Sequence, residues 1–187
     1  PALRLEGFEG EWAQCDFGQI AQLSRGLTYS PSDLVGQHQG VRVYRSSNVQ
    51  EGVVVTKSDD VWVREDAVNI PLLAVGDMII TASNGSPQLV GKSGIVRHLD
   101  APGVPGGFML QCSASTPDFV AALLHTPWFR KLLNAHTAGG SGSIGNLNAS
   151  RLSGEEVLAP SVSEQEAIGT RFRKLDSIIS MTGTRAD

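Results

Sequence analysis

The sequence has little of several features that mark specialised classes of protein. Only two of its 187 residues are cysteines, Cys15 and Cys112, which is too few for a disulfide-stabilised fold, so we expect reduced thiols. No stretch approaches the roughly 18 consecutive apolar residues of a membrane span, and no secretory signal pattern is visible. These absences favour a cytoplasmic globular protein.

An excess of positive charge is also missing, because 19 acidic residues outnumber 15 basic ones and leave a net charge of −4. This balance argues against binding nucleic acid by charge alone, since non-specific affinity comes from neutralising phosphates. It is compatible with a reader of base edges whose basic residues gather on one face. The apolar fraction of 41% is enough for a core, and the length corresponds to one domain or two small ones.

The stretch 157–179 predicts a short strand followed by a helix. The apolar run at its start ends at Pro160, which has no N–H for a sheet ladder. Ser163 and Glu166 have the S-x-x-E spacing of a capping box, so we expect the helix to start there. Apolar residues then recur at helical spacing along one face, and they are our candidates for helix pairing: Ile168, Phe172, Leu175 and Ile179. This stripe fits either a seam for another helix or a terminal helix docked on its own core.

Motifs in three parts of the chain resemble one known family. They are Leu3-Arg4-Leu5 with Phe8–Trp12 and Phe17–Ile20 near the start, Val75–Ile80 with Gly85 and Gly91-Lys92 in the middle, and Pro160, Glu164-Gln165, Ile168 and Leu175–Ile179 near the end. In this order they resemble the specificity subunits of type I restriction-modification systems, over nearly the whole chain. A full subunit of this family carries two target-recognition domains and two long helices. This chain has the length of one domain plus the start of one helix.

The resemblance implies that the chain binds double-stranded DNA and reads one half of a bipartite site. It also implies several partners. These are modification subunits that methylate adenine with S-adenosylmethionine, a motor–nuclease restriction subunit, and a second recognition domain or second copy that pairs through the C-terminal helix. The chain itself would supply no catalytic residue and would need no cofactor and no metal.

Short β-branched runs and two helical segments predict an α/β (α+β) fold with a mixed, largely antiparallel twisted sheet. We expect the runs at 53–55 and 61–63 to pair around Ser58-Asp59-Asp60. A helical hairpin is expected at 117–136, capped by Thr116, and the C-terminal helix should leave the globule. We assign residues 1–156 to the recognition domain and 157–187 to the junction and the start of the conserved helix.

Four polar, glycine-containing connections offer side chains suited to phosphates and base edges. They are 24–33, 45–48, 82–92 and 138–146. The candidate DNA-binding residues are Arg25, Thr28, Tyr29, Arg45, Ser46, Asn48, Ser83, Asn84, Gln88, Lys92, Ser141 and Asn146. A single DNA-binding surface requires these connections to lie on one side of the domain.

Three patterns that suggest enzymes do not meet their structural requirements. The stretch from Gly85 to Ser93 has five residues between its glycines, where a P-loop needs four, and it precedes a strand former instead of a helix. Ser141 lacks the last glycine and the strand–turn–helix context of a nucleophile elbow. Asp59-Asp60 has no third ligand nearby and is interpreted as a solvated turn. The remaining alternatives are a non-catalytic module that binds protein or glycan and, less favoured, a small hydrolase that uses Ser141 or Asp59-Asp60.

Overall fold

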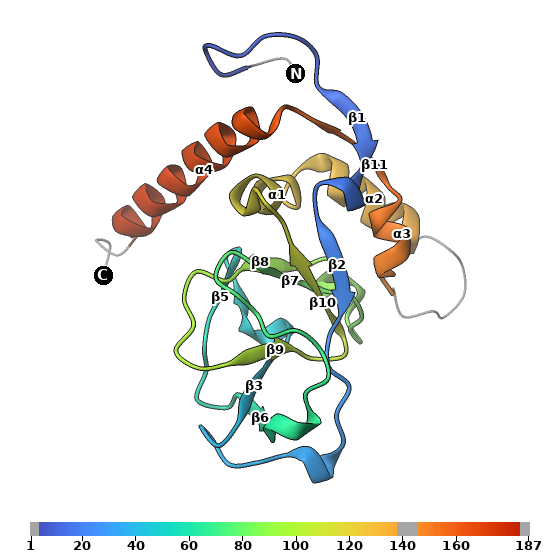
Figure 1. Ribbon diagram of the computed structural model, residues 1–187, viewed down its shortest axis with the longest axis vertical. Coiled ribbons are helices and arrows are strands. Elements are labelled where there is room, and N and C mark those ends of the chain that lie inside the picture. The colour runs from blue at the N-terminus through green and yellow to red at the C-terminus, as the bar shows by residue number, and fades with distance from the viewer. Residues whose placement is uncertain (1–3, 138–145, 184–187) are drawn as a thin grey trace.

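A computed structural model describes residues 4–137 and 146–183 (Figure 1). The strands are β1 (Ala13–Asp16), β2 (Gln22–Arg25), β3 (Val41–Tyr44), β4 (Val49–Gln50), β5 (Val53–Val54), β6 (Val61–Val63), β7 (Met78–Thr81), β8 (Ser93–Ile95), β9 (Gly103–Pro105), β10 (Met109–Ser113) and β11 (Glu156–Ala159). The α-helices are α1 (Pro117–Leu123), α2 (Pro127–Thr137), α3 (Ala149–Ser153) and α4 (Val162–Gly183). Short 3-10 turns are η1 (Phe17–Gln19), η2 (Pro31–Asp33), η3 (Ser46–Asn48), η4 (Glu65–Ala67) and η5 (Pro87–Leu89).

The strands form one central sheet and two smaller ones. The central sheet has six strands in the order β2-β10-β7-β8-β5-β4. The three-stranded sheet β6-β3-β9 lies at one end of the molecule, and β1 pairs with β11 at the other end, beside the helices (Figure 1). Most strand pairs are antiparallel, whereas β3–β9 and β5–β8 are parallel. The mixed, largely antiparallel α+β fold predicted from the sequence is confirmed.

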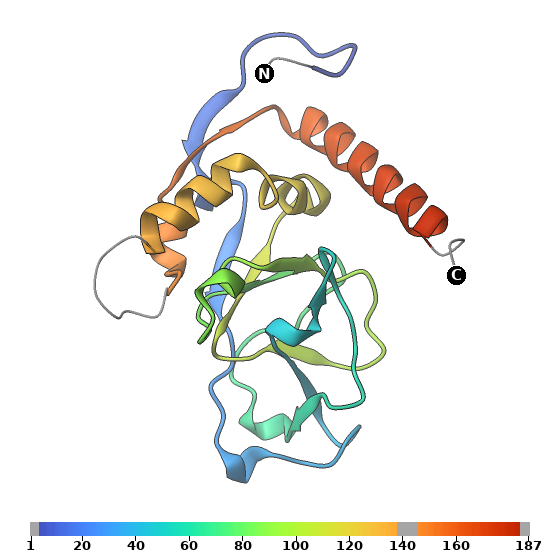
Figure 2. The same cartoon turned by 180° about the vertical axis from the view of Figure 1, so that it is seen from behind.

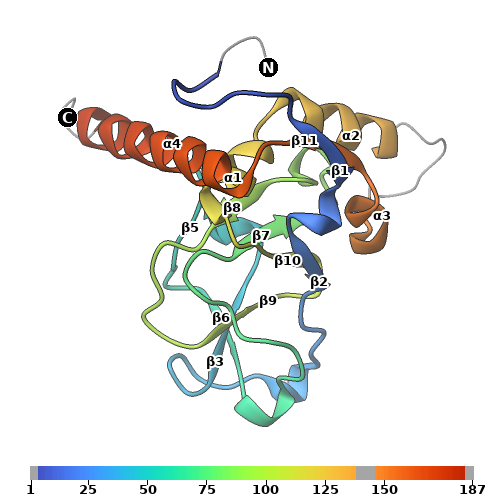
Figure 3. The same cartoon turned by 45° about the horizontal axis from the view of Figure 1, so that its top comes forward.

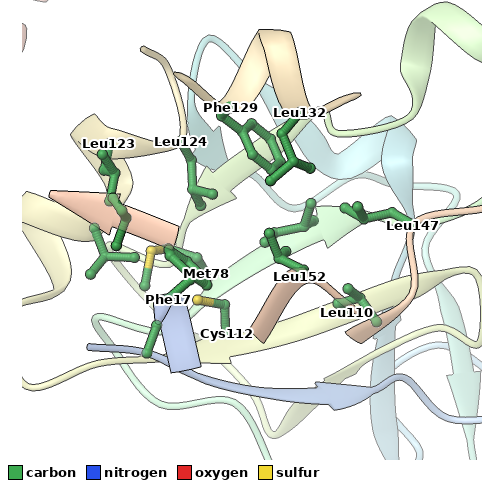
Figure 4. Packing of buried hydrophobic residues seen from close by; sticks show 14 of the residues in the cluster. Phe17, Met78, Leu110, Cys112, Leu123, Leu124, Phe129, Leu132, Leu147 and Leu152 are labelled. Carbon is green, nitrogen blue, oxygen red and sulfur yellow. The ribbon is translucent and has the colours of Figure 1, made fainter. Parts of the chain in front are cut away.

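The central sheet is covered on both faces, because successive side chains of a strand point to opposite sides. Met78 and Ile80 of β7 belong to a cluster that also contains side chains of α1, α2 and α3. Ile79, between them, packs into a second cluster with Tyr44 and Met109. Figure 4 shows the first cluster, where helix and sheet side chains meet, including Leu123, Phe129, Leu152, Met78 and Cys112. This packing fixes the strand ends from which the polar connections leave.

The predicted pairing of 53–55 with 61–63 is wrong. Strand β5 pairs with β4 and β8 in the central sheet, whereas β6 pairs with β3 in the three-stranded sheet. A short run of valines suits any half-buried sheet position, so local pattern alone does not select the partner strand. The turn at 58–60 therefore connects two different sheets.

Helix α4 begins earlier than its capping pattern predicted. Its first residue is Val162, and the hydroxyl of Ser161 accepts a hydrogen bond from the backbone N–H of Glu164 at 3.4 Å. The S-x-x-E spacing occurs twice, at 161–164 and at 163–166. Glu166 is exposed and Glu164 is buried, so the tertiary contacts of Glu164 select the first of the two starts.

The first half of α4 is docked on α1. Gly169 lies at the crossing, where an added Cβ would come within 2.8 Å of the Asp118 Cβ. The Thr116 hydroxyl, predicted to cap α1, donates instead to Gln165 Oε1 at 2.6 Å. From 171 to 179 every side chain is exposed, and this half of the helix projects from the globule (Figures 2 and 3).

Candidate functional site

A groove of about 820 Å³ lies where segments that follow β2, β3, β7 and β9 meet. Its polar lining comes from three of the predicted connections, as Thr28, Tyr29, Arg45, Ser46, Ser83 and Asn84. Its apolar lining is Leu27, Pro31, Leu34, Phe108 and Met109. The tertiary structure thus brings connections from distant parts of the sequence to one concave surface.

Side-chain hydrogen bonds fix the 82–92 connection against the 45–48 connection. The Asn84 amide donates from Nδ2 to Ser46 Oγ at 3.2 Å, and its Oδ1 accepts from the backbone N–H of Ser86 at 2.9 Å. Lys92 Nζ lies 3.5 Å from the carbonyl oxygen of Ser46. The Asn84 amide and the Lys92 ammonium are therefore held in defined positions beside the groove.

Several other predicted residues lie outside the groove lining. Arg25 ends β2 and Gln88 lies in η5, both exposed. Asn146 is exposed as well, and its backbone forms an isolated bridge with Ser83. Ser141 falls outside the described residues.

Asn48 is in the interior, so its predicted contact with DNA has to be corrected. Its side chain is 0% exposed. Oδ1 accepts from the backbone N–H of Arg45 at 2.8 Å, and Nδ2 donates to Val55 O at 3.0 Å and to Asp60 Oδ1 at 2.6 Å. Buried amides are normally hydrogen-bonded in this way. The sequence around Asn48 resembles that around a surface asparagine, so it did not indicate the burial. Asn48 holds the Arg45 turn in place.

The two aspartates of the predicted solvated turn have different environments. The Asp59 side chain is 73% exposed and lies 3.5 Å from Arg45 Nη2. Asp60 is only 6% exposed, which corrects the prediction for this residue. Its Oδ2 accepts from the backbone N–H of Lys57 at 2.9 Å and lies 3.3 Å from Arg42 Nε. Both Asp60 oxygens therefore have structural partners.

Arg42 is the buried cation of this network. Its guanidinium lies 4.6 Å from the centre of the Trp62 ring and donates to Tyr44 Oη at 3.3 Å. It also donates to both oxygens of Asp100, and this pairing lowers the pKa of Asp100 to about 2. Arg42 lies on β3, three residues before Arg45. The network around Arg42 therefore supports the wall of the groove that Arg45 and Ser46 form.

The segment 106–109 lines the groove, and sequence analysis missed it. Phe108 directly precedes β10, which begins at Met109, and the Phe108 side chain is 74% exposed. The sequence signal that could have pointed to this segment is the glycine pair Gly106-Gly107. Backbones pack so closely here that a Cβ on Gly26 would lie 2.1 Å from the carbonyl oxygen of Gly106, and only glycine allows such an approach.

The apolar stripe of α4 is divided between the core and the surface. Ile168 packs against the core cluster. Phe172, Leu175 and Ile179 are 49%, 53% and 66% exposed. Arg173 of the same half lies 3.5 Å from Asp118 of α1. Both interpretations of the stripe thus have a structural counterpart, one in each half of the helix.

Within residues 4–137 and 146–183, no group of three or more His, Cys, Asp or Glu side chains is placed to hold a metal ion. In the same part of the chain, no helix combines the length and apolar character needed to cross a membrane.

Comparison with known proteins identifies relatives in sequence and in fold. No protein-family model matches the sequence. The specificity subunit of the type I restriction enzyme StySPI from Salmonella potsdam is 25% identical over 184 residues, which cover 94% of this chain and 38% of that protein. The chain therefore spans well under half the length of this relative.

Solved structures of similar fold come from the same kind of system. A chain from a study of complex assembly and conformational transition of the type I R-M system has a TM-score of 0.69 at 12% identity, over 95% of this chain and 42% of that chain. The HsdS subunit from Thermoanaerobacter tengcongensis has a TM-score of 0.66 at 12% identity, over 97% and 42%. The type I S subunit from M. genitalium has a TM-score of 0.58 at 14% identity, over 98% and 44%. The resemblance to type I restriction-modification specificity subunits that the sequence motifs indicated is confirmed, in sequence over nearly the whole chain and in fold.

Proposed function

We propose that this chain is a DNA target-recognition domain of a type I specificity subunit and reads one half of a bipartite site. The observation that carries the proposal is the groove, which gathers polar side chains from three separate connections on a fold similar to that of known specificity subunits. Hydroxyl, amide and guanidinium groups of this kind bind phosphates and base edges. The net charge of −4 implies that specific contacts contribute more to binding than charge does.

The proposed domain covers residues 1–156, and residues 157–187 form the junction and the start of the conserved helix. The exposed half of α4 pairs with the helix of a second copy or second domain, in antiparallel orientation. The helix then sets the gap between the two half-sites, at about 1.5 Å per residue. Phe172 and Leu175, about half exposed, supply the apolar surface for this pairing.

The chemistry belongs to the proposed partners. Modification subunits methylate adenine, and a motor–nuclease subunit cleaves unmodified DNA in the cytoplasm. This chain supplies no catalytic residue. Asp60 and its neighbours support this assignment, because their polar atoms are engaged in structural contacts.

Methylome sequencing of the host with and without the gene tests the proposal. We expect adenine methylation at one bipartite motif to disappear when the gene is deleted and to return when it is restored. A restored copy carrying Asn84→Ala should change the bases read in one half of the motif only. An unchanged methylome after deletion, with the modification subunit still produced, would contradict the proposed function.

A further inference from the structure

Phe108 is the most exposed of the large hydrophobic side chains in the described ranges, at 74%. Its backbone is nevertheless held firmly. The Phe108 carbonyl accepts hydrogen bonds from the backbone N–H groups of Ala82 at 2.9 Å and Ser83 at 3.1 Å, and Met109 N donates to Gly106 O at 2.8 Å. The aromatic ring thus stands exposed on a fixed backbone, so contact through it requires little further ordering of the backbone.

The surroundings of Phe108 in the groove are polar on one side. Ser83, which bonds to the Phe108 carbonyl, is followed by Asn84. The bonds of Asn84 to Ser46 and Ser86 use one amide N–H and one oxygen lone pair. An asparagine amide has a second N–H and a second lone pair, and this donor and acceptor match the N7 and N6 atoms on the major-groove edge of adenine.

An A·T base pair offers a partner both to the Asn84 amide and to the Phe108 ring. Its adenine offers the acceptor and donor that suit an asparagine amide, and its thymine places an apolar C5-methyl group in the major groove. Phenylalanine is one of the side chains that contact this methyl group in protein–DNA complexes. A G·C pair offers no methyl group there, so it would leave the Phe108 ring facing polar atoms.

Resting on the proposed DNA-binding function, we propose that Phe108 reads a thymine in the half-site by contact with its C5-methyl group. The residue is therefore a specificity determinant, and the ligand group is a methyl on an A·T pair. Asn84 contacts the adenine of the pair, and Phe108 rejects base pairs without the methyl.

Substitution of uracil for thymine tests this reading, because deoxyuridine lacks only the methyl group. The full chain first selects duplexes from a random library, and each thymine of the selected half-site is then replaced by deoxyuridine in turn. At one position we expect binding, measured by fluorescence anisotropy, to weaken roughly fourfold, as for the loss of one buried methyl-sized group. Phe108→Ala should bind the thymine and uracil duplexes equally, and Phe108→Leu should restore part of the difference. Leu158→Ala is the control, since Leu158 is 55% exposed on β11.

The possible outcomes separate the two proposals. If no sequence is enriched, the proposed DNA recognition fails and this inference fails with it. If a sequence is enriched but no thymine is sensitive to uracil, or if the sensitivity persists in Phe108→Ala, only the thymine reading is overturned. A loss of affinity in Phe108→Ala that is equal for all duplexes would show stacking or wedging of the ring and would also overturn it.

Discussion

Arg4 and Glu164 form a two-point ion pair that ties the N-terminal segment to the first turn of α4. Arg4 Nε donates to Glu164 Oε1 at 3.0 Å, and Nη2 donates to Oε2 at 2.6 Å. Trp12 Nε1 adds a third hydrogen bond to Oε1 at 3.3 Å. The Glu164 side chain is 1% exposed and that of Arg4 is 20% exposed, so two regions that carry family motifs are joined by a shielded contact.

Glu164→Gln should lower the melting temperature by several degrees, because the amide cannot neutralise the Arg4 guanidinium. Glu166→Gln is the matched control, since Glu166 is exposed on the neighbouring turn, and it should leave the melting temperature unchanged. Thermal denaturation followed by circular dichroism measures both.

The same variant has a predicted pH dependence. Hydrogen bonds from Arg4, and then from Trp12, lower the pKa of Glu164 below its ordinary 4.5. The Glu164 carboxylate therefore binds a proton less tightly in the folded protein than in the unfolded chain. The stabilisation that its ion pair gives the fold is complete above pH about 4.5 and is lost as the pH falls through the lowered pKa. The gap in melting temperature between the parent and Glu164→Gln should narrow in acid. A gap that is independent of pH would contradict the ion pair.

Asp60→Ala should destabilise the domain by about 3 kcal/mol in urea denaturation, because it leaves Arg42 buried with one partner fewer. Asp100 still pairs with Arg42, so we expect the lower end of the range for broken buried pairs. The adjacent Asp59→Ala removes an exposed carboxylate and should change the free energy of unfolding by less than about 0.5 kcal/mol. Equal effects of the two substitutions would show that the buried network does not support the fold.

Lys92→Ala should weaken DNA binding about equally for all sequences. The ammonium lies beside the groove wall at Ser46, and we expect it to contact a phosphate, not a base edge. Titration over a range of salt concentrations should show the slope of log K against log salt reduced by about one. Lys131→Ala is the control, since Lys131 is exposed on α2, and it should leave the slope unchanged. A loss confined to one sequence would assign Lys92 to base reading instead.

Asn84→Ala should relax base preference and leave non-specific binding nearly intact. If the amide contacts a base in bidentate fashion, its removal costs about 1–3 kcal/mol on the cognate half-site. Competition between cognate and scrambled duplexes measures the change. Gln50→Ala, an exposed amide on the edge strand β4, serves as control. If Asn84→Ala weakens binding to cognate and scrambled duplexes equally, the Asn84 amide does not contact a base.

Replacing Phe172 and Leu175 together with aspartate should abolish pairing of α4, because carboxylates are costly in an apolar seam. The recognition domain should stay folded, since both side chains are about half exposed. Light scattering follows the association, and thermal denaturation follows the fold. The exposed residues Arg171 and Lys174, both changed to alanine, provide the control. Unfolding of the aspartate variant, or a strictly monomeric parent, would rule out this role for the helix.

The sequence alone determined the features that depend on neighbours along the chain. The β-branched runs specified strands, and Pro160 marked the end of β11 because it cannot donate to a ladder. The stretch after Lys92 forms β8 as its residues favour, which removes the helix that a P-loop needs. The order of the motifs along the chain carries the family resemblance.

Only the tertiary structure decided what depends on contacts between distant segments. Asn48 and Asp60 looked like surface polar residues, yet they hold a buried arginine network together. Phe108 is not among the candidates that the sequence pattern supplied, yet two backbone hydrogen bonds from Ala82 and Ser83, just after β7, hold it at the surface. The start of α4 was set by Arg4, about 160 residues away along the chain. Burial and long-range pairing are properties of packing between segments, and a local pattern contains no information on which segment arrives beside it.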